Sequence, residues 1–227
     1  MKDSYSITQT LVTSLSPLQL AELASKQCSI FYPDGDGPVG RDILNTVERT
    51  LKRLQYCFSH VANRYFFDGR SVLFNHLNGD QYAMWLYMLS NQLHIDGGPK
   101  SWCDKLFLLN KALHGCDIFY EVELPAIFLL VHPLGTVLGR GSYQDYFMAY
   151  QRCGVGSNHG IYPALGKHVT LRPGSAVLGS CEIGNNVAIA TESLVLDSPV
   201  SANSIYFGNP RDHWTRIKTD LESIWRI

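Results

Sequence analysis

The sequence predicts an α+β protein, with a helical N-terminal domain followed by a left-handed parallel β-helix of hexapeptide repeats. Three observations lead to this prediction. Between about residues 40 and 114, apolar residues recur every three or four positions, as on one face of an α-helix. From residue 165 to 195, aliphatic residues recur every six positions, a period typical of a hexapeptide solenoid and of neither a helix nor a flat sheet. Gly, Asn and Ser lie between them, as solenoid corners require.

Three helices are expected in the first domain. The first follows Asp42, and Asp80 is a candidate N-cap for the second, because its side chain can accept a free N–H of the first turn. The third spans 101–114 and stops at Gly115, a residue that easily adopts the left-handed conformation at a helix end. The apolar stripes of the first two helices include Val47, Leu51, Leu54, Tyr82, Trp85, Leu86 and Leu89.

The hexapeptide period defines the second domain. The aliphatic residue of each repeat points into a triangular prism, three repeats complete a coil, and coils stack at the strand spacing of about 4.8 Å. The aliphatic positions are Leu165, Leu171, Val177, Ile183, Ile189 and Val195, which make two full coils. We therefore divide the chain into a helical domain (1–115), a β-helix (116–210) and a C-terminal helical tail (211–227).

Composition and charge exclude several classes of protein. The chain has 227 residues, with 19 Lys and Arg against 20 Asp and Glu, and its formal net charge is -1. Nucleic-acid binding is not expected without a basic surface. No apolar run approaches the roughly 20 residues of a membrane helix, and residues 1–14 lack the apolar core of a secretory signal. The six cysteines form no metal-binding pattern, so we expect reduced thiols, no metal and a cytoplasmic protein.

Several short motifs stand at the start, within and at the end of the predicted β-helix. Asp117 follows the helical domain, 14 residues separate it from His132, and residues 132–139 read HPLGTVLG. A loop ending in Pro163 precedes the regular repeats, and Gly208-Asn209-Pro210 follows them. From about residue 78 to 210 the chain thus resembles the hexapeptide-repeat acyltransferases, serine O-acetyltransferase in particular. That family has the motif H-x-x-G-x-V-V-G, a closing G-x-P and the same separation between its catalytic Asp and His.

The resemblance implies transfer of an acetyl group from acetyl-CoA, without a metal, in a homotrimer or a dimer of trimers with active sites between neighbouring prisms. On this basis His132 is the base that takes a proton from the acceptor, and Asp117 holds its tautomer. Backbone amides near Gly156 and Ser157 stabilise the oxyanion. The acyl group then passes directly to the acceptor, without an acyl-enzyme. His159 competes for the role of base.

Further residues are candidates for binding the two substrates. Small residues allow the pantetheine arm of CoA to approach the backbone, and a basic residue is expected near its phosphates. The candidates for binding CoA are Gly156, Ser157, Gly179, Ser180, Ala190, Lys167, Arg172 and Arg211. The candidates for binding the acceptor are His159, Tyr162 and Tyr150.

Two departures from the family pattern concern the acceptor. Val131 stands where the family has Asp before its His, and Ile161-Tyr162 stands where it has Arg-His. These changes remove charged groups that bind serine, so the sequence favours a hydroxyl of a sugar or of a surface polysaccharide such as capsule or O-antigen. Serine O-acetylation, N-acetylation of an amino sugar and a catalytically inactive trimeric scaffold stay open as alternatives. A nucleophilic role for Cys153 is disfavoured, because small residues pack at its repeat position.

Overall fold

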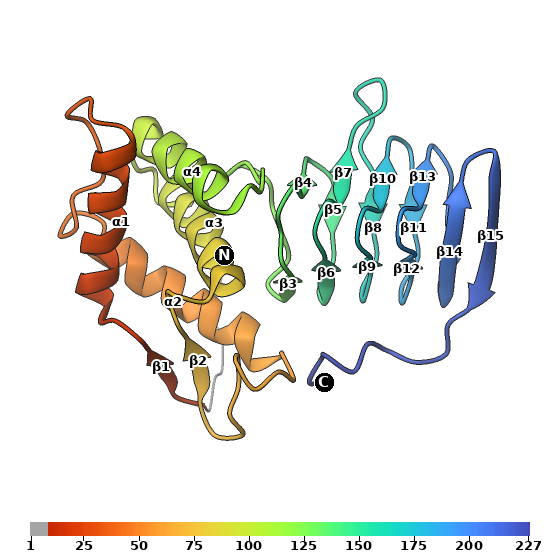
Figure 1. Ribbon diagram of the computed structural model, residues 1–227, viewed down its shortest axis with the longest axis horizontal. Helices are drawn as coiled ribbons and strands as arrows, with labels where there is room; N and C mark the ends of the chain where they lie inside the picture. The colour runs from red at the N-terminus through yellow and green to blue at the C-terminus, as the bar shows by residue number, and fades with distance from the viewer. Residues whose placement is uncertain (1–8) are drawn as a thin grey trace.

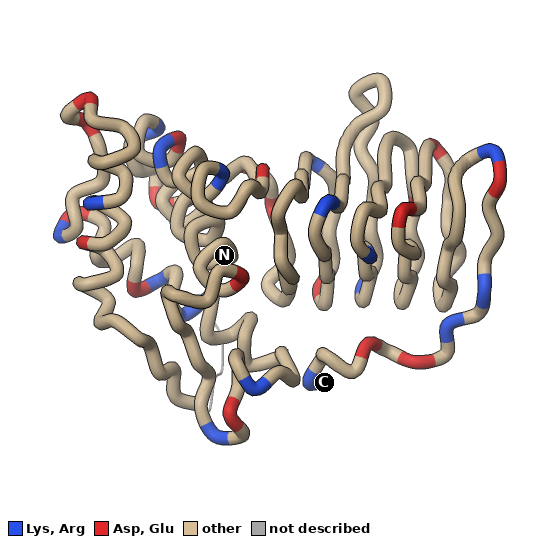
Figure 2. The backbone as a smooth tube through the Cα atoms, in the orientation of Figure 1, with Lys and Arg blue, Asp and Glu red and all other residues tan. Residues whose placement is uncertain are grey.

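The computed structural model describes residues 9–227, with helices at one end and a parallel β-solenoid at the other (Figure 1). The predicted architecture is therefore confirmed. Residues 1–8 lie outside the described residues, and with them the start of the predicted helical domain and most of the segment examined for a secretory signal. Charged residues of both signs are spread over the helices and the solenoid (Figure 2).

The first helix, α1 (Pro17–Phe31), is one that the sequence analysis missed. It begins at a capping box, in which Ser16 Oγ accepts the N–H of Gln19 and the Gln19 side chain accepts the N–H of Ser16. Pro17 occupies the first turn, where its missing N–H costs nothing. Ser16-Pro17-Leu18-Gln19 was thus a readable helix start.

The three expected helices are α2 (Leu44–Ser59), α3 (Gly79–Ile95) and α4 (Lys100–His114). Gly115 ends α4 at φ 61°, in the left-handed conformation expected of it. Every residue of α3 from Gln81 to Leu93 is buried, because α2 and α4 pack against it and the solenoid covers one side. Beside the helices, β1 (Leu11–Thr13) and β2 (Val72–Phe74) form a short parallel pair.

Asp80 is not the N-cap of α3. Asn78 takes that position, where its Oδ1 accepts the N–H of Gln81 at 3.2 Å. The backbone of Asn78 is extended, with φ -89° and ψ 110°, which lets the side chain turn back onto the first turn. Asp80 lies two residues after this N-cap, in the first turn, and its carboxylate is directed to another partner.

The solenoid has three faces, and each is a parallel sheet. One face has the order β13-β10-β7-β4, a second β11-β8-β5, and the third β14-β12-β9-β6-β3, with β15 added antiparallel at its end. The bounds are β3 (Phe128–Leu130), β4 (Val137–Leu138), β5 (Ser142–Tyr143), β6 (Phe147–Ala149), β7 (Gly154–Gly156), β8 (Ala164–Leu165), β9 (Thr170–Leu171), β10 (Ala176–Leu178), β11 (Glu182–Ile183), β12 (Ala188–Ile189) and β13 (Leu194–Leu196).

The six predicted aliphatic positions line the inside of the prism. They stack in register, with Val177 between Val155 and Val195 on one face, and each is at most 3% exposed. The earlier coils place Tyr143 and Ala149 at the corresponding positions, where they pair with Leu165 and Leu171. The tyrosine, the small alanine and the loop between Val155 and Leu165 hid the period upstream of residue 165, so only part of the solenoid could be recognised from the sequence.

The prediction of a C-terminal helical tail was wrong. Residues after the solenoid form β15 (Asp212–Ile217), which pairs antiparallel with β14 (Ser204–Asn209). A solenoid that ended at β14 would leave an unpaired strand edge, and β15 covers it. The tight turn between the two strands is Pro210-Arg211, and Gly208 in β14 next to it has a φ of 99°.

Residues 218–227, which we call the C-terminal strap, return along the third face to the helical domain (Figure 1). There Ala62 N–H donates to the Ile224 carbonyl at 2.6 Å, and Arg226 N–H donates to the His60 carbonyl at 2.8 Å. The strap thereby connects the last coil of the solenoid to the helical domain. It also encloses space beside the first coils.

Candidate active site

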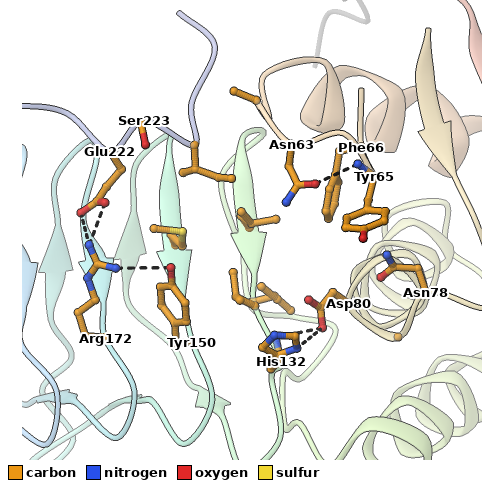
Figure 3. Close-up of a pocket in the computed structure, with 17 residues that line it drawn as sticks. Asn63, Tyr65, Phe66, Asn78, Asp80, His132, Tyr150, Arg172, Glu222 and Ser223 are labelled. Carbon is orange, nitrogen blue, oxygen red and sulfur yellow. Dashed lines mark hydrogen bonds and ion pairs between the residues drawn. The ribbon is translucent and has the colours of Figure 1, made fainter. Parts of the chain in front are cut away.

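A cavity of about 780 Å³ lies between the helical domain, the first coils of the solenoid and the C-terminal strap (Figure 3). We call it the site cavity. The start of α3, the ends of β3, β6 and β9, and the strap each contribute side chains to it. The polar and aromatic residues labelled in Figure 3 are Asn63, Tyr65, Phe66, Asn78, Asp80, His132, Tyr150, Arg172, Glu222 and Ser223.

His132 lies in this cavity and its partner is Asp80. The backbone N–H of His132 donates to Asp80 Oδ1 at 3.0 Å, and His132 Nδ1 lies 3.6 Å from the same oxygen. The second distance is that of an ion pair and is longer than a hydrogen bond; catalytic hydrogen bonds are often this loose without substrate. The imidazole itself is 73% exposed, so it can reach a substrate.

Asp80 is buried much more than His132, with its side chain 22% exposed. Burial raises the pKa of Asp80. The charge of the His132 ring and the hydrogen bond from the His132 backbone N–H both act to lower it. A carboxylate held in a poorly solvated place beside an imidazole is typical of functional sites. Asp80 can therefore orient the ring and stabilise its protonated form.

The backbone conformation of His132 is also unusual. Its φ is 49°, in the left-handed region, which costs energy for a residue with a side chain. Most other residues with positive φ stand at solenoid corners and bond to the corner of the preceding coil, as Asn186 N–H does to the Lys167 carbonyl at 2.8 Å. His132 instead has its N–H fixed by Asp80 from the helical domain. The strain is thus maintained by a contact that also sets the position of the ring.

Asp117 was predicted to pair with His132, but in the structure it pairs with Lys111. Asp117 Oδ2 accepts from Lys111 Nζ at 2.6 Å. Among residues 9–227, the carboxylate that makes an ion pair with His132 is that of Asp80. Asp117 follows Gly115 closely and therefore remains near the end of α4, where Lys111 is available. The sequence analysis missed Asp80 because its contact with His132 spans 52 residues, and no local pattern reports such a distance.

Tyr150 and Arg172 lie deeper along the same cavity. Arg172 Nη1 donates to Tyr150 Oη at 3.4 Å, and the guanidinium carbon lies 5.5 Å from the centre of the tyrosine ring. Both oxygens of Glu222, in the C-terminal strap, lie 2.8 Å from Arg172 Nη2. Tyr150 and Arg172 thus both line the site cavity, and the guanidinium of Arg172 is paired with a carboxylate.

The other acceptor candidates do not line the site cavity. His159 and Tyr162 lie on the loop after β7, which projects from the solenoid in Figure 1. Asn158 and Ile161 exchange backbone hydrogen bonds at 3.1 and 3.0 Å, and Asn158 Nδ2 donates to Asp197 Oδ2 at 2.5 Å. These bonds shape the loop and hold its base, and Ile161 and Tyr162 stay exposed.

The residues predicted to bind CoA are distributed along the solenoid. Gly156 and Ser157 lead into the projecting loop, and the Ser180 N–H donates to Asp197 Oδ1 at 2.8 Å beside Gly179. Lys167 and Arg211 are exposed, Ala190 is buried at the end of β12, and none of these three lines the site cavity. Of this set, only Arg172 lines the site cavity of its own chain, to which His132 also belongs.

The six cysteines are free thiols and all are buried. Burial raises the pKa of Cys57 and Cys116 to about 12, and it also raises the pKa of Cys153. A thiol with a raised pKa is a poor nucleophile at neutral pH. Cys153 is thus better described as part of the packed prism.

Residues 9–227 lack two kinds of feature. Within this range no cluster of three or more His, Cys, Asp and Glu side chains is suited to hold a metal ion. In the same part of the chain, no helix has the length and apolar character needed to cross a membrane.

Comparison with known proteins agrees with the resemblance seen in the motifs. No family model matches the sequence. A serine acetyltransferase from Synechococcus elongatus is 33% identical over 93 residues. The matched region is 39% of this chain and 38% of that relative, so the chain is aligned with well under two thirds of the relative's length.

Solved structures extend the likeness to most of the chain. The serine acetyltransferase of Neisseria gonorrhoeae has a TM-score of 0.68 at 18% identity, over 92% of this chain and 83% of that one. The enzyme of Brucella abortus strain S19 in complex with coenzyme A has a TM-score of 0.69 at 18% identity, over 92% and 85%. At such identities the likeness concerns the fold. The chain therefore has the fold of serine acetyltransferase structures, four helices followed by a parallel β-solenoid.

Proposed function

We propose that the protein is an acetyl-CoA-dependent O-acetyltransferase of the serine acetyltransferase type. The observation that carries this proposal is the exposed imidazole of His132, held by the partly buried carboxylate of Asp80 at the wall of the site cavity. Support comes from the serine acetyltransferase relative and from a structural neighbour that was solved with coenzyme A.

In the proposed reaction, His132 takes the proton of the acceptor hydroxyl as that oxygen attacks the thioester carbonyl. The new C–O bond forms, the C–S bond breaks, and the thiolate of CoA leaves with a proton returned by the imidazolium. Asp80 acts as a positioning residue that stabilises the imidazolium. Because both substrates meet in one site, proximity supplies much of the acceleration and no acyl-enzyme is needed.

The acceptor that the observations support best is a small hydroxy amino acid such as serine. The cavity is lined by the carboxylate of Asp80 and the guanidinium of Arg172. Charges of both signs are therefore present for a zwitterion, although Arg172 is paired with Glu222 in the free protein and the family's Asp and Arg-His are missing. A sugar hydroxyl is the second candidate. It is favoured by Val131 at the cavity and by the exposed, uncharged Ile161 and Tyr162 on the projecting loop.

We further propose that the active protein is a homotrimer. The projecting loop carries His159 and Tyr162 away from the site cavity of its own chain. A neighbouring prism would bring these side chains, and the amides near Gly156 and Ser157, to a second chain's His132. Analytical ultracentrifugation at micromolar concentration checks the mass, for which three copies are expected.

The acceptor is tested by following thiol release from acetyl-CoA with a panel of compounds. The panel contains L-serine, glucosamine, free sugars, nucleotide sugars and capsular polysaccharide. We expect release with L-serine, and the product mass identifies the acetylated hydroxyl. Release with sugars alone would transfer the proposal to the second candidate. If no compound releases thiol and acetyl-CoA does not bind in calorimetry, the protein is a scaffold and the proposal fails.

Replacing Asp80 with Asn is expected to lower kcat by about tenfold to a hundredfold, with little change in KM. An interaction with a charged partner is worth roughly 1.5–3 kcal/mol, and each 1.4 kcal/mol corresponds to a factor of ten in rate. The Asn side chain keeps an acceptor for the His132 N–H but loses the charge that stabilises imidazolium. The acidic limb of the pH–kcat/KM profile should therefore move to lower pH.

Asp117→Asn is the matched comparison for this variant, because Asp117 was the partner expected from the sequence. We expect its kcat and pH profile to stay close to those of the unmodified protein, since Asp117 pairs with Lys111. A larger loss for Asp117→Asn than for Asp80→Asn would show that His132 changes partner in the working enzyme.

A further inference from the structure

Three charged side chains, Arg172, Glu222 and Lys218, form a cluster in which the first two line the site cavity and Lys218 pairs with Glu222. Glu222 lies 2.8 Å from Arg172, and its Oε1 lies 3.4 Å from Lys218 Nζ. Arg172 comes from the end of β9, and the other two belong to the C-terminal strap. Lys218 is deeply buried, with its side chain 9% exposed.

The cluster has two positive charges and one negative charge. Among residues 9–227, Glu222 is the carboxylate that pairs with either cation. The remaining polar partners are neutral, namely Tyr150 for Arg172 and Asn186 for Lys218, whose Nζ lies 2.9 Å from Asn186 Oδ1. Burial lowers the pKa of Lys218, Glu222 acts in the opposite direction, and the neighbouring Arg172 adds to the lowering. A second anion would relieve this uncompensated positive charge.

We propose that Arg172 and Tyr150 form the subsite for a carboxylate of the acceptor, and that Glu222 occupies this subsite until the acceptor binds. The inference deepens the proposed function, on which it rests for the hydroxyl that is acetylated. It assigns the selection of an acceptor that carries a carboxylate to residues of the third solenoid face and of the strap. The group now seated on Arg172 is itself a carboxylate, with both oxygens turned to one guanidinium nitrogen, which shows that the position accepts this chemistry.

The register of the strands places this subsite at a useful distance from His132. Leu130, Ala149 and Leu171 pair across β3, β6 and β9 and point into the prism. The next residues, Val131, Tyr150 and Arg172, therefore point outward in a row. Since neighbouring strands are about 4.8 Å apart, the backbone of Arg172 lies roughly 10 Å from that of Val131, next to His132. A small hydroxy acid spans such a gap once the two side chains reach toward it.

The rival explanation is that the Arg172–Glu222 pair only fastens the strap. The strap, however, has its own attachments to the helical domain. Its Ile224 and Arg226 make backbone hydrogen bonds there, and the Arg226 guanidinium lies 3.6 Å from the centre of the Phe67 ring. Trp225 packs on Tyr146 with ring centres 5.5 Å apart. Glu222 is thus not required to hold the strap in place and is free to exchange with a ligand.

The test uses two matched pairs of probes, L-serine with L-serinamide and glucuronate with glucose, titrated by calorimetry into the full-length protein without acetyl-CoA. In at least one pair we expect the carboxylate compound to bind about tenfold more tightly or better, as a charged hydrogen bond allows. Arg172→Gln should abolish that preference. Glu222→Gln should tighten binding of the carboxylate compound several-fold, because its competitor is neutralised.

Matched controls separate recognition from folding. Arg140 pairs with Glu121 on the exposed surface, 3.2 Å apart, so Arg140→Gln should leave the preference intact. Arg172→Lys keeps the charge and should restore part of the preference, and thermal unfolding verifies that each variant is folded. Equal affinity within both pairs, no binding of any probe, or a preference that survives Arg172→Gln overturns the inference. Since the readout is binding, it is independent of thiol release, which tests the proposed function.

Discussion

Replacing His132 with Asn is expected to lower kcat/KM for acetyl transfer by roughly 10²–10⁴-fold, the usual contribution of a general base. Asparagine is polar and tolerates the left-handed backbone found at this position, so the fold should survive. It has no group that can take the hydroxyl proton. Steady-state thiol release from acetyl-CoA with the best acceptor of the panel measures the loss.

Two further histidines serve as comparisons for this result. His94 lies exposed at the other end of α3, roughly 20 Å along the helix axis from Asp80, and His94→Asn should retain full activity. His159→Asn tests the competing base. We expect a smaller loss, mainly in KM, because an acceptor contact is removed while the base remains. If His159→Asn abolished activity and His132→Asn did not, the assignment of the base would be reversed.

Replacing Phe147 with Ala is expected to lower the free energy of unfolding by about 3–5 kcal/mol. Phe147 is fully buried inside the prism, and its ring contacts that of Tyr143 edge-on, with centres 5.1 Å apart. The closely stacked coils cannot collapse into the space that the ring leaves. Urea unfolding at one fixed protein concentration measures the change, since assembly would otherwise alter the apparent stability.

Leu77→Ala is the matched control, because Leu77 is 80% exposed and its truncation should change stability by no more than about 0.5 kcal/mol. Phe147 begins the strand that leads to Tyr150, so its loss should also weaken acceptor binding. A change in unfolding free energy below about 1 kcal/mol for Phe147→Ala would contradict the tightly packed prism that we describe, since buried aromatic truncations normally cost several times more.

The charged residues of the site cavity come from distant parts of the chain, so the charge of the cavity depends on how these parts are arranged. The site cavity joins three segments distant in the sequence, namely the start of α3, the first coils and the C-terminal strap. Each supplies a charged group, with Asp80, Arg172 and Glu222 respectively. Movement of the strap would therefore alter the charge of the cavity as well as its size.

The periodic part of the fold could be predicted from the sequence. Positions such as Leu171 and Ile189 repeat every six residues because each coil repeats the environment of the one before it, and both are fully buried. The stop at Gly115 was readable for a similar reason, since the left-handed end of a helix is a local requirement. His132 was found through its motif, and the structure places it at a cavity.

Other features depended on contacts that no local pattern records. Asp80 was interpreted as a helix cap, whereas its carboxylate meets His132 from 52 residues away. Residues 211–227 were expected to be helical, whereas residues 212–217 form β15 on the open edge of β14 and the strap then returns to the end of α2. Arg172 was assigned to CoA, whereas Glu222 reaches it from 50 residues away.

The sequence by itself determined the solenoid, its preceding helices and the imidazole, because these follow from periodicity and from residues next to one another in the chain. The tertiary structure alone decided which carboxylate supports His132 and what lies on Arg172. The physical reason is that burial and charge pairing depend on distance in space, and only the folded chain brings α3, β9 and the strap to one cavity.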